Sequence, residues 1–296
     1  MTTRSLVTFF GFRRQRDVCA PPYCGADPLD IVIRKLELRL ALSPEEKGTL
    51  RSTFAATREY TSGQDLLTEG ERPTFVGALL RGALCCYKAL PNGLRQIVAL
   101  PLPGDILDLH SFSLERIDHS IGALAPSILA IATHAAVEEM TEAHPRLAML
   151  LWRDAVVEAA VAREWVVNCG RRDAHARIAH MLCEIYVRAA AVGLAKDGVC
   201  PLPMTQSDVG DATGLSVVHV NRVLQRLRAE NLIVFGSGRL TIHDWDGLAK
   251  AAGFNPAYLH ASDAMRGGRG FAFRPPVDSP SGSEAGHGGG EIALGI

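Results

Sequence analysis

The sequence predicts an α+β fold in which an N-terminal β-roll (a jelly roll) is followed by a long helix and a C-terminal winged helix-turn-helix. Residues 60–132 contain short apolar runs separated by glycines, a texture typical of many short strands in a closed roll. Residues 144–169 keep apolar side chains at helical spacing, and residues 204–233 hold two helical patterns joined by a glycine turn. A parallel α/β fold is excluded, because no helical segments alternate with the strands.

The bulk composition fits two domains of ordinary size and identifies no partner. The chain has 296 residues, 47% of them hydrophobic, and a formal net charge of -1. Its seven cysteines are an odd number at irregular spacing, which excludes a small disulfide scaffold. The N-terminal segment lacks the long apolar region of a secretory signal, and no apolar run is long enough to cross a bilayer. We therefore expect a cytoplasmic protein with reduced thiols and no membrane partner.

Changes in composition and in hydrophobic periodicity along the chain predict its domain organisation. Both ends lack a sustained hydrophobic period, so we expect disordered tails over residues 1–28 and 263–296. Between them we expect a β-roll domain over 29–143, a dimerisation helix over 144–169 and a winged helix-turn-helix domain over 170–262. A helix this long and apolar needs cover on more than one side, from the roll and from a second copy of itself. Burial wholly within one monomer is the alternative.

Two strand pairs are expected within the roll. Residues 84–90 and 94–100 flank the Pro-Asn-Gly segment 91–93, where Asn and Gly tolerate the positive φ of a tight turn, so a hairpin is expected. A second pair, residues 121–125 and 128–131, is separated by a proline. Short strands with such turns are typical of a roll.

The segment after Met204 carries the start and stop signals of a helix-turn-helix. Thr205 can cap a first short helix, and Asp208 completes a capping-box arrangement with it. Gly214 then supplies the positive φ with which a chain turns directly after a helix. Ser216 is a second good N-cap and opens a longer helix.

The two helices have different inner and outer faces. The inner face is apolar and consists of Val209, Ala212, Val220, Val223, Leu224 and Leu227. Leu215 fills the turn, and the small Gly210 lets the helices approach closely. The outer face of the second helix consists of Val217, Val218, Asn221, Arg222 and Gln225. Such a face suits the major groove, where Arg can pair with guanine, Asn with adenine and an apolar group with the thymine methyl.

A hairpin is expected directly after the second helix. Residues 233–235 and 239–242 flank Gly236-Ser237-Gly238, which completes the layout of a winged helix-turn-helix. An αα-hairpin with no role in DNA binding is the alternative. The two caps, the glycine turn, the consistent inner face and the wing together favour a DNA-binding unit.

Three stretches of the chain carry a family resemblance. They are TQSDVGDATGLSVVHVNRVLQRLRAENLI, GRRDAHARIAHMLCEI from Gly170, and GLRQIVALPLPGDILDL from Gly93. They resemble the family of the cyclic-AMP receptor protein and the fumarate–nitrate reduction regulator (the Crp/Fnr family), from about Leu42 to Gly253. The resemblance implies a bacterial transcription regulator with a cyclic-nucleotide-binding-like β-roll, a dimerisation helix and a winged helix-turn-helix. Its expected partners are a palindromic site in double-stranded DNA, a second copy of the chain, and RNA polymerase.

The resemblance also implies roles for single residues. The family's base-reading positions fall on Val217, Val218 and Arg222, and Arg222 is expected to contact guanine. Val218 stands where a glutamate is often found, which implies a different half-site sequence. Phosphate contacts are expected at Gln206, Ser216 and His219. For His219, an ordinary surface residue is the alternative. The complete predicted DNA-binding set is Thr205, Gln206, Ser216, Val217, Val218, His219, Asn221 and Arg222.

The signal is not identified by this resemblance. Members that bind cyclic nucleotides carry a Gly-Glu motif and then an Arg-Ser or Arg-Thr pair that holds the phosphate. Here Gly104-Asp105 and His119-Ser120 stand in their places. Without the arginine a cyclic phosphate loses a charge-assisted, bidentate contact, so cyclic AMP is not expected as a ligand.

No cofactor is predicted. An iron–sulfur cluster usually needs four thiolates, and the N-terminal region offers only Cys19 and Cys24. Adding Cys85 or Cys86 does not reproduce the closely spaced set of the family's oxygen sensor. Haem ligation by His110 or Cys85 has no further support. Most of the cysteines are interpreted as small buried apolar residues, and a regulator controlled only by its own abundance fits the sequence.

Two other functional classes are compatible with a β-roll. Metal-dependent oxygenases also use β-rolls, but they need a compact His/Glu cluster. Between Tyr60 and Thr133 the only histidines are His110 and His119, so we expect no enzyme. The second rival is a signal-binding roll protein of the same fold that has lost DNA binding, and the intact Arg222 argues against it.

Overall fold

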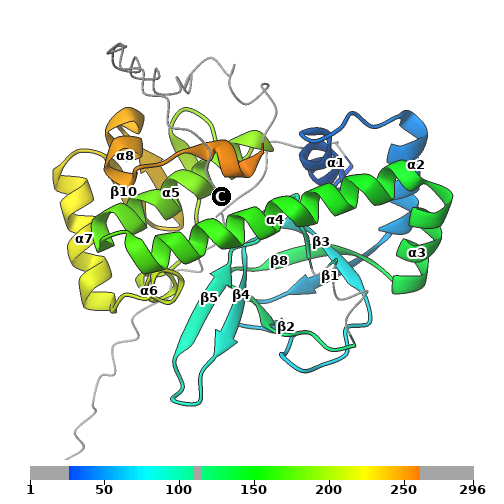
Figure 1. Cartoon of the computed structure of the whole chain (residues 1–296), viewed down its shortest axis with the longest axis horizontal. Helices are drawn as coiled ribbons and strands as arrows, with labels where there is room; N and C mark the ends of the chain where they lie inside the picture. Colours follow the sequence, from blue (N-terminus) through cyan, green and yellow to red (C-terminus); the bar gives the residue numbers. More distant parts are fainter. Residues whose placement is uncertain (1–26, 108, 110–114, 261–296) are drawn as a thin grey trace, which may run out of the picture.

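The computed structural model describes residues 27–107, 109 and 115–260. The two expected tails lie outside these residues, apart from positions 27 and 28, and so do Cys19, Cys24 and His110. A single long helix, α4 (Pro145–Arg171), runs along the molecule and contacts both of its halves (Figure 1). The β-roll and the N-terminal helices lie along one part of α4, and the helix-turn-helix lies at its C-terminal end.

The N-terminal part of the roll domain is helical. Helix α1 (Asp30–Glu37) buries four apolar side chains, and α2 (Pro44–Thr53) begins with a capping box between Ser43 and Glu46. The short helix α3 (His134–Ala143) precedes α4 and is capped by Thr133, whose side chain accepts from the Ala136 N–H. These helices share a core with one face of the roll and the first half of α4. Helices α1 and α2 are not among the elements predicted from the sequence.

The roll consists of two four-stranded antiparallel sheets. Their strand orders are β1-β8-β3-β6 and β2-β7-β4-β5. The bounds are Ala56–Tyr60 for β1, Asp65–Leu67 for β2, Val76–Arg81 for β3, Leu84–Ala89 for β4, Arg95–Ala99 for β5, Ile106–Leu107 for β6, Ser120–Ala123 for β7 and Ser127–Ala132 for β8. The expected hairpin is confirmed as β4–β5, and Gly93 in its turn has a φ of 82°.

The second expected strand pair is wrong in its pairing. Strands β7 and β8 exist close to the predicted positions, but they belong to different sheets. Strand β7 pairs with β2 and β4, whereas β8 pairs with β1 and β3. The chain passes from one sheet to the other at Pro126, where Ser127 Oγ accepts a hydrogen bond from the Ala83 backbone N–H. The two strands therefore find partners far away in sequence instead of each other.

The C-terminal half is a helical domain with a small sheet. Helix α5 (Ala174–Ala191) follows α4, and α6 (Gln206–Thr213), α7 (Val217–Ala229) and α8 (Trp245–Ala252) pack around it. Strands β9 (Val199–Pro201), β10 (Ile233–Gly236) and β11 (Arg239–Ile242) form a sheet in the order β10-β11-β9. The 3-10 helix η2 (Pro256–Leu259) lies against α4. Within the described part of the chain, no helix has the length and apolar character needed to span a membrane.

Candidate DNA-binding site

The caps of the helix-turn-helix form as the sequence predicts. The Thr205 hydroxyl accepts from the Asp208 N–H at 3.1 Å, and the Asp208 carboxylate accepts from the Thr205 N–H at 2.8 Å. Gly214 ends α6 with a φ of 66°. Ser216 caps α7 by accepting from the His219 N–H at 3.3 Å. The turn between the helices is therefore fixed by local hydrogen bonds at both of its ends.

The predicted inner face is buried. It comprises Val209, Ala212, Val220, Val223, Leu224 and Leu227. Gly210 is needed at the turn itself, since a Cβ there would lie 2.6 Å from the carbonyl oxygen of Leu215. Glycine was expected here to let the two helices approach each other. The structure shows that it is needed mainly because α6 lies close to the backbone of the turn. This packing fixes the direction in which α7 points away from the domain.

The outer face of α7 is open to solvent. Val218 is 71% exposed and Val217 is 48% exposed, and the Arg222 side chain is also exposed. Val217 and Val218 are therefore accessible to a partner at the start of a polar helix face. The base-reading positions implied by the family resemblance therefore share one accessible face.

Helix α6 contributes to the same surface. Asn221 donates a hydrogen bond from its Nδ2 to Gln206 Oε1 at 3.1 Å, which joins the first turn of α6 to α7. The Thr205 hydroxyl donates to Asp208 at 2.7 Å, so its hydrogen is used in the cap and its contribution is to position α6. Ser216 and His219 are exposed at the start of α7. The structure thus brings the predicted DNA-binding residues together.

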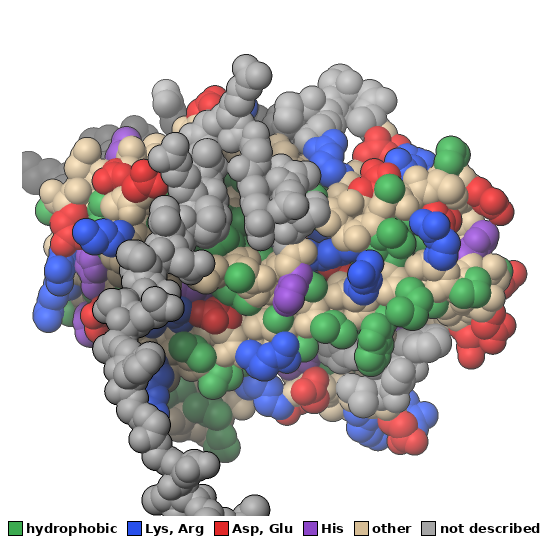
Figure 2. Space-filling view, turned by 45° about the horizontal axis from the view of Figure 1, so that its top comes forward, with side chains coloured by type: hydrophobic (Ala, Val, Ile, Leu, Met, Phe, Trp, Pro, Cys, Tyr) green, Lys and Arg blue, Asp and Glu red, His purple; other side chains and the backbone are tan. Residues whose placement is uncertain are grey.

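The wing is a tight hairpin beside α7. Strands β10 and β11 pair from Ile233–Ile242 to Gly236–Arg239, and Ser237 and Gly238 have φ values of 51° and 72°. Positive φ at both turn positions is typical of a two-residue hairpin turn. Basic and histidine side chains lie near the end of the molecule that carries α7 (Figure 2).

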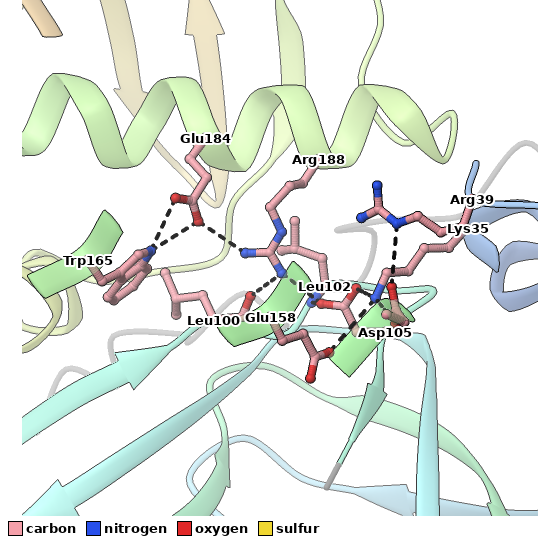
Figure 3. A network of polar contacts seen from close by, with 10 residues as sticks. Lys35, Arg39, Leu100, Leu102, Asp105, Glu158, Trp165, Glu184 and Arg188 are labelled. Atoms are coloured by element: carbon pink, nitrogen blue, oxygen red, sulfur yellow. Dashed lines mark hydrogen bonds and ion pairs between the residues drawn. The ribbon is translucent and has the colours of Figure 1, made fainter. Parts of the chain in front are cut away.

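A buried charge network joins the DNA-binding domain to the roll (Figure 3). Arg188 on α5 donates to Asp105 at 2.8 Å and to the Leu100 carbonyl at 3.1 Å. Lys35 on α1 lies 2.8 Å from Asp105 and 2.8 Å from Asp154 on α4. Burial alone would raise the pKa of Asp105, but Lys35 and Arg188 outweigh it and lower this pKa. Asp105 is therefore an anchor between domains.

The network continues to a fully buried carboxylate on α5. Glu184 accepts from Trp165 Nε1 at 3.0 Å and from the Tyr258 hydroxyl at 2.8 Å, and it lies 3.3 Å from Arg188. Burial, followed by the charge of Glu184, strongly raises the pKa of Tyr258. These residues are not among those predicted from the sequence. A signal existed in Glu184, a single acid within the apolar run MLCEIYV.

A cavity of about 410 Å³ lies between the roll, α1, α4 and α5. Its lining includes Val98, His119, Val157, Glu158, Arg188 and Leu259. His119 hydrogen-bonds Asp118 through Nδ1 at 2.9 Å. Most of the cavity lining is apolar, and charged groups of the interdomain network also line it.

The described cysteines are free thiols. Cys85, Cys183 and Cys200 are buried, as the sequence analysis expects for small apolar residues. Burial raises the pKa of Cys85 to about 11 and that of Cys200 to about 12, so these thiols stay protonated at neutral pH. Over residues 27–107, 109 and 115–260, no group of three or more His, Cys, Asp or Glu side chains could hold a metal ion.

A β-roll, a long helix and a winged helix-turn-helix with an open recognition face define a DNA-binding transcription regulator. A model of the cyclic nucleotide-binding domain matches residues 57–144, and a model of the Crp-like helix-turn-helix domain matches residues 176–251. The nitrogen fixation regulation protein FixK of Bradyrhizobium diazoefficiens is 32% identical over 190 residues, which cover 62% of this chain and 77% of FixK. The chain belongs to the Crp/Fnr family of transcription regulators.

Further similarities agree with this assignment. The transcriptional activator protein FnrL of Cereibacter sphaeroides is 26% identical over 234 residues, which cover 78% of this chain and 92% of FnrL. The solved structure of FixK2 from Bradyrhizobium japonicum superimposes with a TM-score of 0.61 at 27% identity and covers 66% of this chain and 96% of that chain. A Crp/Fnr regulator from Thermus thermophilus has the same fold, with a TM-score of 0.53 at 18% identity over 67% of this chain and 99% of that chain.

Proposed function

We propose that the protein binds an inverted-repeat DNA site as a homodimer and reads each half-site with α7. The observation that carries this proposal is the open face of α7, where Val217, Val218 and Arg222 stand together beside a capped helix start. Arg222 is assigned to guanine, for which a bidentate arginine contact is the commonest specific contact in the major groove. Val217 and Val218 are assigned to thymine methyl groups.

The other predicted residues are assigned to support and phosphate contact. The Asn221–Gln206 hydrogen bond presents two amide groups next to Arg222. Asn221 is assigned to adenine, and Gln206 is assigned to the DNA backbone together with Ser216 and His219. Thr205 keeps α6 in place through its cap. Phosphate contacts of this kind fix the register of the protein on DNA, whereas base contacts specify the sequence.

An exposed apolar stripe on α4 supports the homodimer. The stripe consists of Met149, Trp152, Val156, Ala159 and Val166, all of them exposed. Their spacing alternates between three and four residues before Ala159, as in the seam of a coiled coil. Figure 2 shows hydrophobic side chains exposed along this helix. The opposite face of α4 is buried against the protein and includes Leu147, Leu150, Leu151, Asp154 and Trp165.

A two-fold dimer built on this stripe would place two α7 helices in successive major grooves about 34 Å apart. The target is then an inverted repeat, because the protein symmetry is matched by the symmetry of its site. We infer RNA polymerase as a further partner, since curated relatives such as FnrL are transcriptional activators. We assign the chain no catalytic role, since these relatives are transcription regulators.

The test is selection of bound duplexes from a random DNA pool by the wild-type protein and by Arg222→Ala. The wild type should enrich an inverted repeat. Arg222→Ala should bind that site more weakly by about 1–3 kcal/mol and lose preference at one position of each half-site. Arg226→Ala is the matched control, because Arg226 is exposed on the same helix but pairs with Glu230 at 2.8 Å.

Two outcomes would contradict the proposal. A folded dimer of the wild type that enriches no sequence would favour a signal-binding roll protein without DNA binding. An equal loss of affinity by Arg222→Ala on specific and on random duplexes would refute base reading by Arg222. Selection under air and without oxygen would also reveal any dependence on a redox cofactor.

A further inference from the structure

One side chain of the roll holds the first helix of the helix-turn-helix. Arg95 begins β5, and its guanidinium donates from Nε to Asp211 at 2.9 Å and from Nη2 to Asp208 at 2.9 Å. Both carboxylates belong to α6. Next to it, Gln96 Nε2 donates to the Ala212 carbonyl at 3.4 Å. The β4–β5 hairpin is therefore in direct polar contact with α6.

Arg95 is itself held in place from the roll side. Its guanidinium carbon lies 5.3 Å from the centroid of the Tyr87 ring, and the Tyr87 hydroxyl donates to Asp65 at 3.0 Å. The Arg95 side chain is only 33% exposed, and Asp208 and Asp211 are 13% and 27% exposed. A planar guanidinium that bridges two carboxylates fixes geometry better than a single exposed ion pair.

The contact reaches the recognition surface through the α6 cap. One Asp208 oxygen accepts from Arg95, and the other accepts from the Thr205 backbone N–H. Helix α6 packs on α7 through the buried inner face, and its first turn bonds Asn221 through Gln206. A shift of α6 relative to the roll would consequently move α7 by a similar amount.

The covalent link between the domains is short, and polar contacts add to it. Only Arg172 and Asp173 separate α4 from α5. The Arg188–Asp105 pair anchors α5 to the roll, and Arg95 adds a separate anchor on α6. Contacts on two different helices oppose rotation of the domain more than a contact on one helix does.

We propose that Arg95 is a positioning residue for DNA binding, which sets the angle of the helix-turn-helix relative to the roll and thereby the separation of the two recognition helices. This inference rests on the proposed binding of an inverted repeat by a homodimer. Each base pair added between half-sites moves them apart by about 3.4 Å and rotates one against the other. A dimer with firmly held domains should therefore tolerate a narrow range of spacings.

The experiment measures affinity as a function of half-site spacing. Full-length wild type, Arg95→Ala, Arg95→Lys and Asp211→Asn are titrated against duplexes that carry the selected half-sites at the optimal spacing, at one or two base pairs more or fewer, and as a single half-site. Lys88→Ala is the matched control, since Lys88 lies on the same hairpin and pairs with Glu69 inside the roll at 2.6 Å. Asp211→Asn keeps the size of the side chain and leaves the Asp208 cap intact.

Wild type and Lys88→Ala should prefer one spacing sharply. In Arg95→Ala and Asp211→Asn the ratio of affinities between the optimal and the neighbouring spacing should fall at least three-fold, with unchanged affinity for the single half-site. The spacing preference of Arg95→Lys should lie between those of the wild type and Arg95→Ala, because an ammonium group cannot hold both carboxylates in the same fork. A purely structural role would instead weaken every duplex equally.

An unchanged spacing profile in Arg95→Ala and Asp211→Asn, or an equal loss on all duplexes, overturns the inference while the proposed function stands. If the wild type itself shows no preference for spacing, the proposed binding of an inverted repeat fails, and the role of Arg95 fails with it. Thermal unfolding of each variant identifies any that does not fold, and Asp211→Asn then decides the question.

Discussion

Acidification should destabilise the DNA-binding domain through His180. This side chain of α5 is only 1% exposed, stacks with the Tyr258 ring and meets the Phe254 ring edge to face. Burial, followed by the charge of Arg172, lowers the pKa of His180 from 6.5 to about 4, while Glu164 opposes the shift. His180 Nε2 lies 3.3 Å from a Glu164 oxygen but makes no hydrogen bond. The fold therefore accepts the neutral imidazole and resists its protonation.

The direction and the size of this pH effect on stability follow from the unfolded and folded pKa values of His180. A histidine with a folded pKa below its unfolded pKa contributes stability that is present above about pH 6.5 and is lost as the pH falls toward 4. The full shift from 6.5 to about 4 corresponds to about 3 kcal/mol. Between pH 7 and pH 5 the linkage relation gives a loss of about 2 kcal/mol from this group. That is a large part of the stability of an ordinary domain.

The measurement compares urea unfolding of the wild type and of His180→Phe at several pH values between 7 and 5. Phenylalanine keeps an aromatic ring in the cluster and cannot titrate. All other titrating groups are present in both proteins, so they cancel from the difference in the free energy of unfolding. This difference should shift by about 2 kcal/mol in favour of His180→Phe at pH 5. A difference that stays constant with pH would refute the buried neutral histidine.

The remaining predictions concern the turn and the reading face. Gly210→Ala places a Cβ 2.6 Å from the Leu215 carbonyl oxygen and should lower the free energy of unfolding by about 1–3 kcal/mol. Gly48→Ala is the control, because its Cβ would meet nothing within 4 Å and alanine favours a helix; equal effects of both changes would contradict the crowding. Val218→Glu should select cytosine at one position of each half-site, since a carboxylate accepts from the cytosine N4 amino group, and an unchanged selected sequence would show that Val218 lies away from the bases.

The helix-turn-helix was readable from the sequence because its signals are local. The caps Thr205 and Ser216 act within three residues of themselves, and Gly214 marks the turn by its own φ. The same holds for the β4–β5 hairpin, whose turn residues are adjacent in the chain. Where a short segment determines its own geometry, its residue types and their spacing are sufficient to predict that geometry.

Helices α1 and α2 were not predicted from their local signals. Helix α2 buries only Glu46 and Leu50, so its hydrophobic period is too weak to predict a helix, although Ser43, Pro44 and Glu46 carry a readable capping box. The pairing of β7 and β8 was misassigned for a different reason. Adjacent strands usually pair, but in this roll the chain changes sheets between them, and only tertiary packing determines that.

Contacts between the domains are the feature that is hardest to predict from the sequence. Arg95 meets Asp208 and Asp211 across more than 110 residues of sequence, and Asp105 meets Lys35 and Arg188 across 70 or more. A charged residue in a sequence does not indicate its partner when both are polar surface types. These contacts require the folded arrangement of the roll on α4.

The contacts between the domains at Asp105 and at Arg95 differ in strength, and this difference predicts which of these two opens first. Asp105 is 8% exposed and lies between Lys35 and Arg188, which are 13% and 21% exposed. Breaking such a buried pair leaves an uncompensated charge and costs about 3–5 kcal/mol. The Arg95 contact is more exposed, at 33% for the arginine, and ion pairs near the surface contribute about 0–1 kcal/mol. Of these two contacts, the one between Arg95 and α6 therefore costs less to release when the domain angle changes, and the Asp105 contact stays closed.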